Sequence, residues 1–140
     1  MCGIVGAVSK REVAPILIEG LKRLEYRGYD SAGLSTVEYG SGLTQIREVG
    51  KVIGLEALVS ESEINGKLGI AHTRWATHGK PSKDNAHPHV SSDKISVVHN
   101  GIIENFQEIK DFLVNEGYEF KSDTDSEVIP HLIHYHFEFV

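Results

Sequence analysis

Cysteine is nearly absent from this sequence of 140 residues, in which Cys2 is the only one. A single cysteine excludes an internal disulfide, and we expect a reducing, cytoplasmic compartment. Basic residues are also few, with 14 against 20 acidic residues and a net charge of −6. This balance argues against a broad surface for nucleic acid or for an anionic membrane. Because long apolar runs and a recognisable signal peptide are lacking too, we expect no membrane partner.

The residues that are present suffice for one folded domain. Hydrophobic residues make up 40% of the chain, and its length is typical of a single domain. Predicted strands alternate with predicted helices, and some strands follow one another through short turns, which indicates a layered α/β or α+β domain. The apolar pattern predicts strands at 3–8, 32–37, 43–49, 68–72, 95–99 and 117–120, and helices at about 12–25, 52–59 and 105–115.

Two segments need a separate interpretation. Residues 73–94 are too many and too polar for a simple connector, so we expect a functional loop there. The stretch "TDSE" fits a capping box of Thr124 with Glu127 and predicts a final helix. Pro130 lies just inside that helix and should distort its first turns or delay its start. The apolar residues expected along this helix are Val128, Ile129, Leu132 and Ile133.

Cys2 stands directly after the initiator Met, and this position has two interpretations. A lone thiol is commonly a small buried hydrophobe, so Cys2 could simply belong to the core. Alternatively, aminopeptidases remove an initiator Met when the next side chain is small, which would leave Cys2 with a free α-amine. An α-amine has a reference pKa of about 8, so part of it is neutral at physiological pH and can accept the thiol proton. Nucleophile and base would then belong to one residue.

Four stretches occur in order along the chain: "MCGIVG", "LEYRGYDSAG", "GIAHTRWATHG" and "HNGIIENF". In these, and in "NAHPHV" and "TDSEVI", the chain resembles the glutaminase domain of the glucosamine-6-phosphate synthase family, also called glutamine–fructose-6-phosphate aminotransferases. These are class II glutamine amidotransferases within the N-terminal nucleophile hydrolases. The resemblance implies an α+β fold, a four-layer α/β/β/α sandwich of two facing antiparallel sheets.

The resemblance runs over nearly the whole chain, but it matches only the first part of the family's longer glutaminase domain. We therefore expect residues 1–140 to be a C-terminally truncated glutaminase domain that lacks the strands completing its sheets. The family's sugar isomerase domain is expected to be absent as well. A truncated domain can expose sheet edges and self-associate, so a homo-oligomer is among the expected partners.

The family's activity supplies two functional hypotheses. The first is hydrolysis of L-glutamine to glutamate and ammonia through a Cys2 γ-glutamyl thioester, with no metal or organic cofactor. In the full-length enzyme, the ammonia would pass to the sugar isomerase domain for glucosamine-6-phosphate synthesis from fructose-6-phosphate. The alternative is a catalytically silent fragment that keeps only the fold and an interaction surface.

The stretch "HNG" could supply an oxyanion hole. The Asn100 amide can donate a hydrogen bond to an oxyanion, and the Gly101 N–H can approach closely because glycine has no Cβ. Asn-Gly between apolar runs is also a strong signal for a tight hairpin, and the pattern alone favours the hairpin. The resemblance reverses this preference, since the matching residues form the family's oxyanion hole.

Glutamine carries an α-carboxylate and an α-ammonium, and two charged residues suit them. Arg74 offers a planar fork for a carboxylate, and Asp125 offers a counter-charge for an ammonium. The alternatives are a surface ion pair for Arg74 and a helix N-cap for Asp125. The resemblance assigns both residues to the substrate.

The resemblance implies further substrate contacts around these residues. It places Thr77 and His78 at the glutamine, with Trp75 on the same mobile loop. Gly28 is similar to a backbone contact near the cysteine, and the neighbouring Arg27 supports the N-terminus. His87 resembles a position that communicates with the partner domain.

Histidine is abundant, with eight in the chain, and invites a metal interpretation. His131 and His134 would share a helical face, but His136 would not align with both. No carboxylate or cysteine set completes a site, so we expect no native metal. Histidines that are solvated, or satisfied within the core, explain the pattern better.

Overall fold

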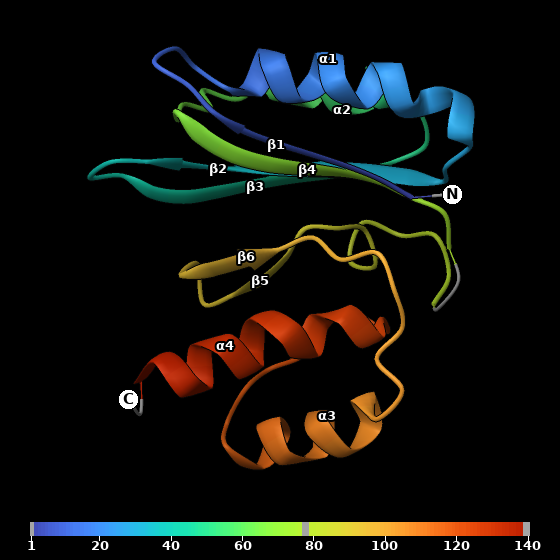
Figure 1. Cartoon of the computed structure of the whole chain (residues 1–140), viewed down its shortest axis with the longest axis vertical. Helices are drawn as coiled ribbons and strands as arrows, with labels where there is room; N and C mark the ends of the chain where they lie inside the picture. The colour runs from blue at the N-terminus through green and yellow to red at the C-terminus, as the bar shows by residue number, and fades with distance from the viewer. Residues whose placement is uncertain (1, 77–78, 139–140) are drawn as a thin grey trace.

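The computed structural model describes residues 2–76 and 79–138, without the Arg27 side chain. Its elements form four layers (Figure 1). Helices α1 (Ala14–Leu24) and α2 (Val52–Glu61) cover one face of a four-stranded sheet. A two-stranded sheet lies on the other face, helix α4 (Val128–Glu138) lies beyond it, and helix α3 (Phe106–Asn115) packs against α4 on the outside. The predicted α/β/β/α layering is confirmed.

Both sheets are antiparallel, as predicted. The larger has the order β1-β4-β2-β3, and the smaller pairs β5 with β6. The β1–β4 register sets Gly3 opposite Thr73, so Cys2 stands beside the end of β4. The strands are β1 (Gly3–Val8), β2 (Ser31–Glu38), β3 (Gly42–Val49), β4 (Leu68–Arg74), β5 (His89–Ser91) and β6 (Ile95–Val97).

The apolar core lies between the four-stranded sheet and helices α1 and α2. Leu17 and Leu21 are fully buried because they recur at helical spacing on one face of α1. Ala32 and Leu34 face them, since alternate residues of a strand point to the same side of a sheet. Burial of each leucine side chain stabilises the fold by roughly 1.5–3 kcal/mol.

The interface between the two sheets is polar. Ser35 Oγ lies 2.7 Å from Ser96 Oγ, and Gln45 Nε2 donates to the Pro88 carbonyl at 2.6 Å. Gly33 permits the closest approach, because a Cβ there would lie 2.1 Å from the His87 carbonyl oxygen. This interface therefore depends on hydrogen bonds and on the lack of a Cβ at Gly33 rather than on apolar packing.

The strand predicted at 117–120 is wrong. These residues follow α3 without strand pairing, and Tyr118 N–H donates to the Leu113 carbonyl at 3.0 Å. The Phe120 ring packs against the His131 ring of α4 instead, with centroids 4.7 Å apart. Aromatic residues favour strands and helix-packing surfaces alike, so the apolar pattern alone could not separate the two outcomes.

The segment predicted as one long loop contains strand β5, which forms a hairpin with β6. Ser92 and Asp93 make the turn with positive φ values of 48° and 55°. Lys94 N–H closes it by donating to the Ser91 carbonyl at 2.9 Å. The sequence lacks the usual Asn-Gly signal at this turn, which explains why the hairpin was not predicted.

The predicted capping box is also wrong. Thr124 makes no side-chain cap bond, and its hydroxyl lies 2.8 Å from His89 Nε2. Glu127 instead accepts hydrogen bonds from the backbone N–H groups of Lys121 and Ser122. The two residues still fix the start of the final helix, but through partners earlier in the chain.

The final helix begins with a 3₁₀ turn, η2 (Asp125–Glu127), and becomes α-helical only at Val128. This delayed start confirms the effect predicted for Pro130. The predicted apolar face is only partly correct, since Val128 is buried but Ile133 is 41% exposed. His131 and His134 take the buried positions because both bind Ser91 Oγ of β5.

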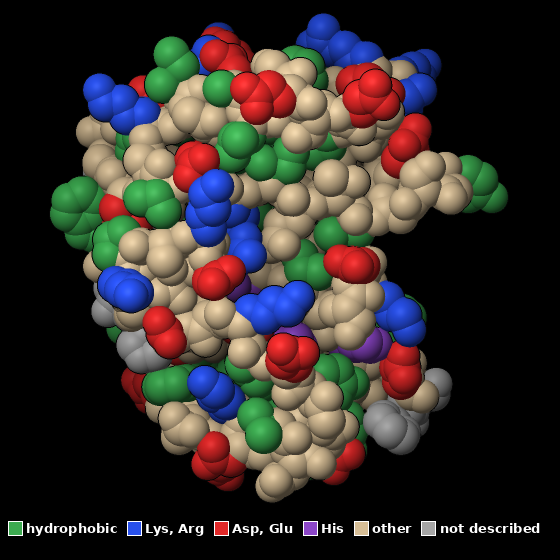
Figure 2. Space-filling model, turned by 180° about the vertical axis from the view of Figure 1, so that it is seen from behind, with side chains coloured by type: hydrophobic (Ala, Val, Ile, Leu, Met, Phe, Trp, Pro, Cys, Tyr) green, Lys and Arg blue, Asp and Glu red, His purple; other side chains and the backbone are tan. Residues whose placement is uncertain are grey.

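The outer surface carries charges of both signs. On the face drawn in Figure 2, Lys and Arg side chains lie among Asp and Glu side chains and gather into no broad patch of one sign. Within the described part of the chain, every helix is too short or too polar to cross a membrane.

Candidate active site

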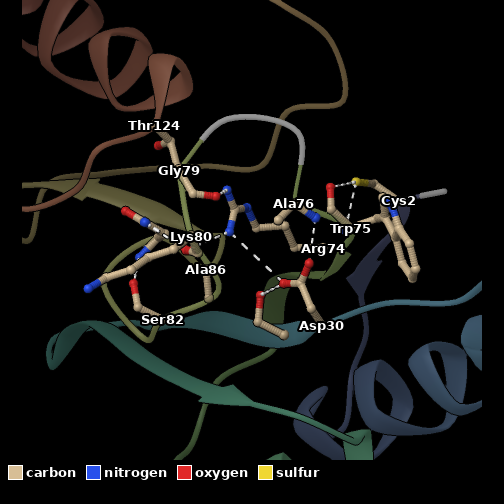
Figure 3. A network of polar contacts seen from close by, with 12 residues as sticks. Cys2, Asp30, Arg74, Trp75, Ala76, Gly79, Lys80, Ser82, Ala86 and Thr124 are labelled. Atoms are coloured by element: carbon tan, nitrogen blue, oxygen red, sulfur yellow. Dashed lines mark hydrogen bonds and ion pairs between the residues drawn. The ribbon is translucent and has the colours of Figure 1, made fainter.

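Cys2 lies at the start of β1, where the chain reaches the end of β4. Gly3 N–H donates to Thr73 Oγ1 at 3.1 Å and holds the two strands together at this point. Trp75 N–H donates to Cys2 Sγ at 3.2 Å (Figure 3). The thiol is only partly buried, so the interpretation of Cys2 as a core residue is wrong.

A small cavity of about 40 Å³ brings the predicted site residues together. This volume is room for only a few water molecules, at roughly 10–15 Å³ each, so bound glutamine would require side chains to move. Its walls come from the residue before β1, the end of β4, His87, the segment around residue 100 and the start of η2. The predicted residues that line it are Cys2, Arg74, Trp75, His87, Asn100, Gly101 and Asp125.

Asn100 and Gly101 line the same cavity as the cysteine. Asn100 Nδ2 donates to the Cys2 carbonyl at 3.2 Å. Gly101 has a positive φ of 157°, and a Cβ there would lie 2.8 Å from His99 Nε2. Residues 98–105, all of them described, contain no strand, so the tight-hairpin interpretation is wrong. The geometry places the Asn100 amide at the Cys2 backbone, in the cavity that the thiol also lines.

Arg74 ends β4 and is only 4% exposed, which excludes a surface ion pair. Its Nη2 donates to the Gly79 carbonyl at 3.1 Å, and its Nη1 donates to the Lys80 carbonyl at 3.3 Å. Figure 3 shows the guanidinium pointing to these two carbonyls, on the side away from Cys2. Arg74 therefore places a buried positive charge in the cavity wall and holds the following loop.

Asp125 is the first residue of η2, and Thr124 occupies the N-cap position, so the N-cap interpretation of Asp125 is wrong. Asp125 Oδ2 accepts a hydrogen bond from Ile103 N–H at 2.7 Å. This bond ties the Asn100–Gly101 segment to the final helix. The carboxylate is 5% exposed and supplies the negative charge of the cavity wall.

Comparisons with known proteins agree with this geometry. A family model described as a glutamine amidotransferase domain matches residues 72–140. The chain is 62% identical over 135 residues to the glutamine–fructose-6-phosphate aminotransferase (isomerizing) of Yersinia pseudotuberculosis. It is 56% identical over 138 residues to the enzyme of that name from Legionella pneumophila. These matches cover 96% and 99% of the chain but only 22% and 23% of the relatives, so the chain spans less than a quarter of their length.

Solved structures agree as well. Glutamine phosphoribosylpyrophosphate amidotransferase from B. subtilis superimposes with a TM-score of 0.76 at 29% identity, covering 96% of this chain and 29% of that one. A second structure, the allosteric regulatory enzyme of purine biosynthesis, has the same TM-score and coverage at 31% identity. The chain belongs to the class II glutamine amidotransferases. Its α+β layers match the N-terminal part of this domain.

The amidotransferase domain also depends on Asp30, which the sequence analysis missed. Its carboxylate accepts hydrogen bonds from Ala76 N–H and, at 3.1 Å, from Ser31 Oγ. It also lies 4.0 Å from Arg74 Nη1. Asp30 thus connects the start of β2 to the segment after β4, and its place within the stretch "LEYRGYDSAG", directly before a buried strand, was the signal that could have found it.

The remaining predicted contacts have different outcomes. The Trp75 ring is half exposed and lies over Gly28, where a Cβ would be 3.3 Å from the ring and φ is +77°. Trp75 therefore lies between the two: its ring covers Gly28, and its N–H donates to Cys2 Sγ. Thr77, His78 and the Arg27 side chain fall outside the described residues, so their roles stay predictions.

Buried histidines form a layer beneath the cavity of the amidotransferase domain. The His72 and His87 rings stack with centroids 4.2 Å apart, and His89 follows at 4.5 Å from His87. Burial is the main cause that lowers the pKa of all three, that of His72 to about 4, so they are neutral at pH 7. His87 is buried and lines the cavity together with Cys2, and its communication with a partner domain stays a prediction.

The histidines of the final helix are satisfied by the core. His131 Nδ1 and His134 Nδ1 each lie 2.8 Å from Ser91 Oγ, which confirms their shared face. His131 Nε2 also lies 2.9 Å from Glu127 Oε2. Among the described residues, no group of three or more His, Cys, Asp or Glu side chains could hold a metal ion.

Proposed function

We propose that this domain hydrolyses L-glutamine to glutamate and ammonia through a γ-glutamyl thioester on Cys2. The observation that supports the proposal is the single cavity lined by Cys2, Asn100, Gly101, Arg74 and Asp125, which come from segments far apart in the chain. A nucleophile, hydrogen-bond donors and opposite charges together are what hydrolysis of a zwitterionic amide requires.

In the proposed reaction, the Cys2 α-amine, freed by removal of Met1, accepts the thiol proton. The thiolate attacks the amide carbon, and its electron pair forms the C–S bond. The oxyanion receives hydrogen bonds from the Asn100 amide and the Gly101 N–H. Its collapse breaks the C–N bond, and the leaving nitrogen takes the proton back from the amine to depart as ammonia. Water then attacks the thioester and releases glutamate and the thiol.

Substrate holding is proposed for the two charged residues of the cavity wall. Arg74 would hold the α-carboxylate of glutamine, and Asp125 would hold the α-ammonium. Thr77, His78 and Trp75 are proposed to line the same subsite, and Gly28 and Arg27 to support it. Opposite charges on buried, anchored side chains distinguish glutamine from a neutral amide.

The relatives' name suggests the larger context. We propose that a longer cytoplasmic protein containing this domain passes the ammonia to a sugar isomerase domain, which uses it to aminate fructose-6-phosphate. The support is the 62% identity to a relative that bears this activity in its name.

Replacement of the nucleophile tests the proposed reaction. Cys2→Ser should abolish glutamine hydrolysis with the fold intact, because a hydroxyl is much harder to ionise than a thiol. The electrophilic glutamine analogue 6-diazo-5-oxonorleucine should label Cys2 alone, as checked by peptide mass spectrometry. Turnover by the serine variant, or a wild-type chain with a free Cys2 amine that neither hydrolyses glutamine nor takes the label, would favour the silent-fragment alternative.

A further inference from the structure

The Asn100 side chain is held in one orientation by two hydrogen bonds. Its Nδ2 donates to the Cys2 carbonyl at 3.2 Å, and its Oδ1 lies 2.7 Å from His72 Nε2. Exchange of the amide O and N would set Oδ1 against the Cys2 carbonyl, where two acceptors repel. The orientation is therefore fixed, and His72 Nε2 must carry the proton of this bond.

His72 is suited to hold a neighbour in place. It is fully buried, and its strand β4 lies between β1 and β2, with Ile4 and Gly33 as its register partners. Its ring is stacked on His87. Because its strand pairs on both sides and its ring is stacked, His72 has little freedom to move if the Asn100 side chain rotates.

The protonation state of His72 points in the same direction. Burial lowers its pKa to about 4, so the ring carries one proton at pH 7. The hydrogen bond with Asn100 requires that proton on Nε2. Its Nδ1 is buried and, within the described residues, has no hydrogen-bond partner. The single donor of this ring is therefore directed to Asn100.

We propose that His72 is a positioning residue, whose Nε2–H fixes the Asn100 amide so that its NH₂ group faces the cysteine. This inference rests on the proposed function. An Asn100 amide released from His72 could rotate and present its oxygen to the developing oxyanion, which is repulsive. Since the oxyanion exists only during the reaction, loss of the His72 bond should lower kcat and leave KM nearly unchanged.

Three variants test the kinetic consequence. His72→Phe keeps a stacking ring but removes the donor, and it should lower kcat about 10- to 100-fold with KM within about twofold. His72→Gln can place an amide N–H near the same point and should restore most of the rate. His134→Gln is the matched control, because it replaces a buried histidine that binds Ser91 outside the cavity; it should leave kcat unchanged.

A double-mutant cycle separates positioning from a general loss of structure. On an Asn100→Ala background, His72→Phe should have no further effect on kcat, because the amide it orients is gone. Additive losses would show that His72 acts elsewhere and would overturn the proposal. Wild-type kcat in His72→Phe would overturn it equally.

A measurement on the unsubstituted chain tests the His72–Asn100 hydrogen bond without requiring enzymatic activity. Nitrogen-15 NMR should show the His72 ring with Nε2 protonated and Nδ1 bare at pH 7. The opposite tautomer would overturn the proposal, even if the substituted chains failed to fold. If the wild-type chain does not hydrolyse glutamine, the proposed function fails, while the tautomer still decides whether His72 orients Asn100.

Discussion

At the scale of single residues, Arg74 and Asp125 carry the opposite charges of the cavity wall, and both are at least 95% buried. Each substitution to Ala would remove one charge-assisted contact to glutamine, about 1.5–3 kcal/mol. We therefore expect KM to rise about 10- to 100-fold in each variant, measured by steady-state glutaminase assays.

Arg47 supplies the matched control for Arg74. It also donates to backbone carbonyls, those of Asp84 and Ala86, but it does not line the cavity. Arg47→Ala should lower stability without raising KM. Equal rises in KM for Arg47→Ala and Arg74→Ala would contradict a direct role for Arg74 in holding the substrate.

Some residues of the site could be predicted from the sequence, and others could not. Cys2, Asn100 and Gly101 were predictable because each stands in a short motif whose residue types match one chemical step. His72 and Asp30 were not, since their importance comes from pairing with Asn100, Ala76 and Arg74 across distant segments. The hydrogen-bond partner of a histidine in an apolar strand cannot be predicted until the strand register is known.

At the scale of elements, β2 approaches the second sheet through Gly33. Gly33→Ala would place a Cβ 2.1 Å from the His87 carbonyl oxygen, which forces the backbone to shift. We expect the free energy of unfolding to fall by about 1–3 kcal/mol or more, measured by urea denaturation.

Gly6 of β1 is the control for this substitution. An alanine there meets no atom within 4 Å. Gly6→Ala should therefore leave stability nearly unchanged or raise it slightly. A similar loss in both variants would show that the effect comes from strand glycines in general rather than from the contact with His87.

Most elements were predictable because apolar periodicity reflects burial. Strands and helices from residue 3 to residue 115 lie within two residues of their predicted bounds wherever they were predicted. The exceptions are polar or aromatic. Strand β5 was missed because His89 and Ser91 are buried by hydrogen bonds rather than by apolar contact, and residues 117–120 were assigned a strand because their aromatic rings pack against a helix.

At the scale of the whole molecule, the buried histidine layer couples stability to pH. The pKa values of His72, His87 and His89 are lowered in the folded state, chiefly by burial, with Arg74 adding to the effect and Glu127 opposing it at His89. As pH falls below 6.5, the unfolded chain binds protons that the folded chain does not. Stability should therefore decrease from pH 7 toward pH 4, by up to about 1.4 kcal/mol per pH unit for each histidine.

Urea unfolding at pH 5, 6 and 7 measures this slope. His87→Gln should reduce the change in unfolding free energy per pH unit by up to about 1.4 kcal/mol, the contribution of one histidine. The exposed His136 provides the comparison, and His136→Gln should leave the slope unchanged. A stability that does not change between pH 7 and pH 5 in the wild type would contradict the neutral, buried layer.

The role of the Cys2 α-amine is tested most directly by comparing two forms of the chain that differ only in their N-terminus. Intact mass first establishes that one form begins at Cys2 and that the other keeps an additional residue before it. The blocked form should fold equally well but hydrolyse glutamine about 10²–10⁴-fold more slowly, because it lacks the general base. Equal rates in the two forms would show that another group deprotonates Cys2 and would contradict the N-terminal nucleophile mechanism.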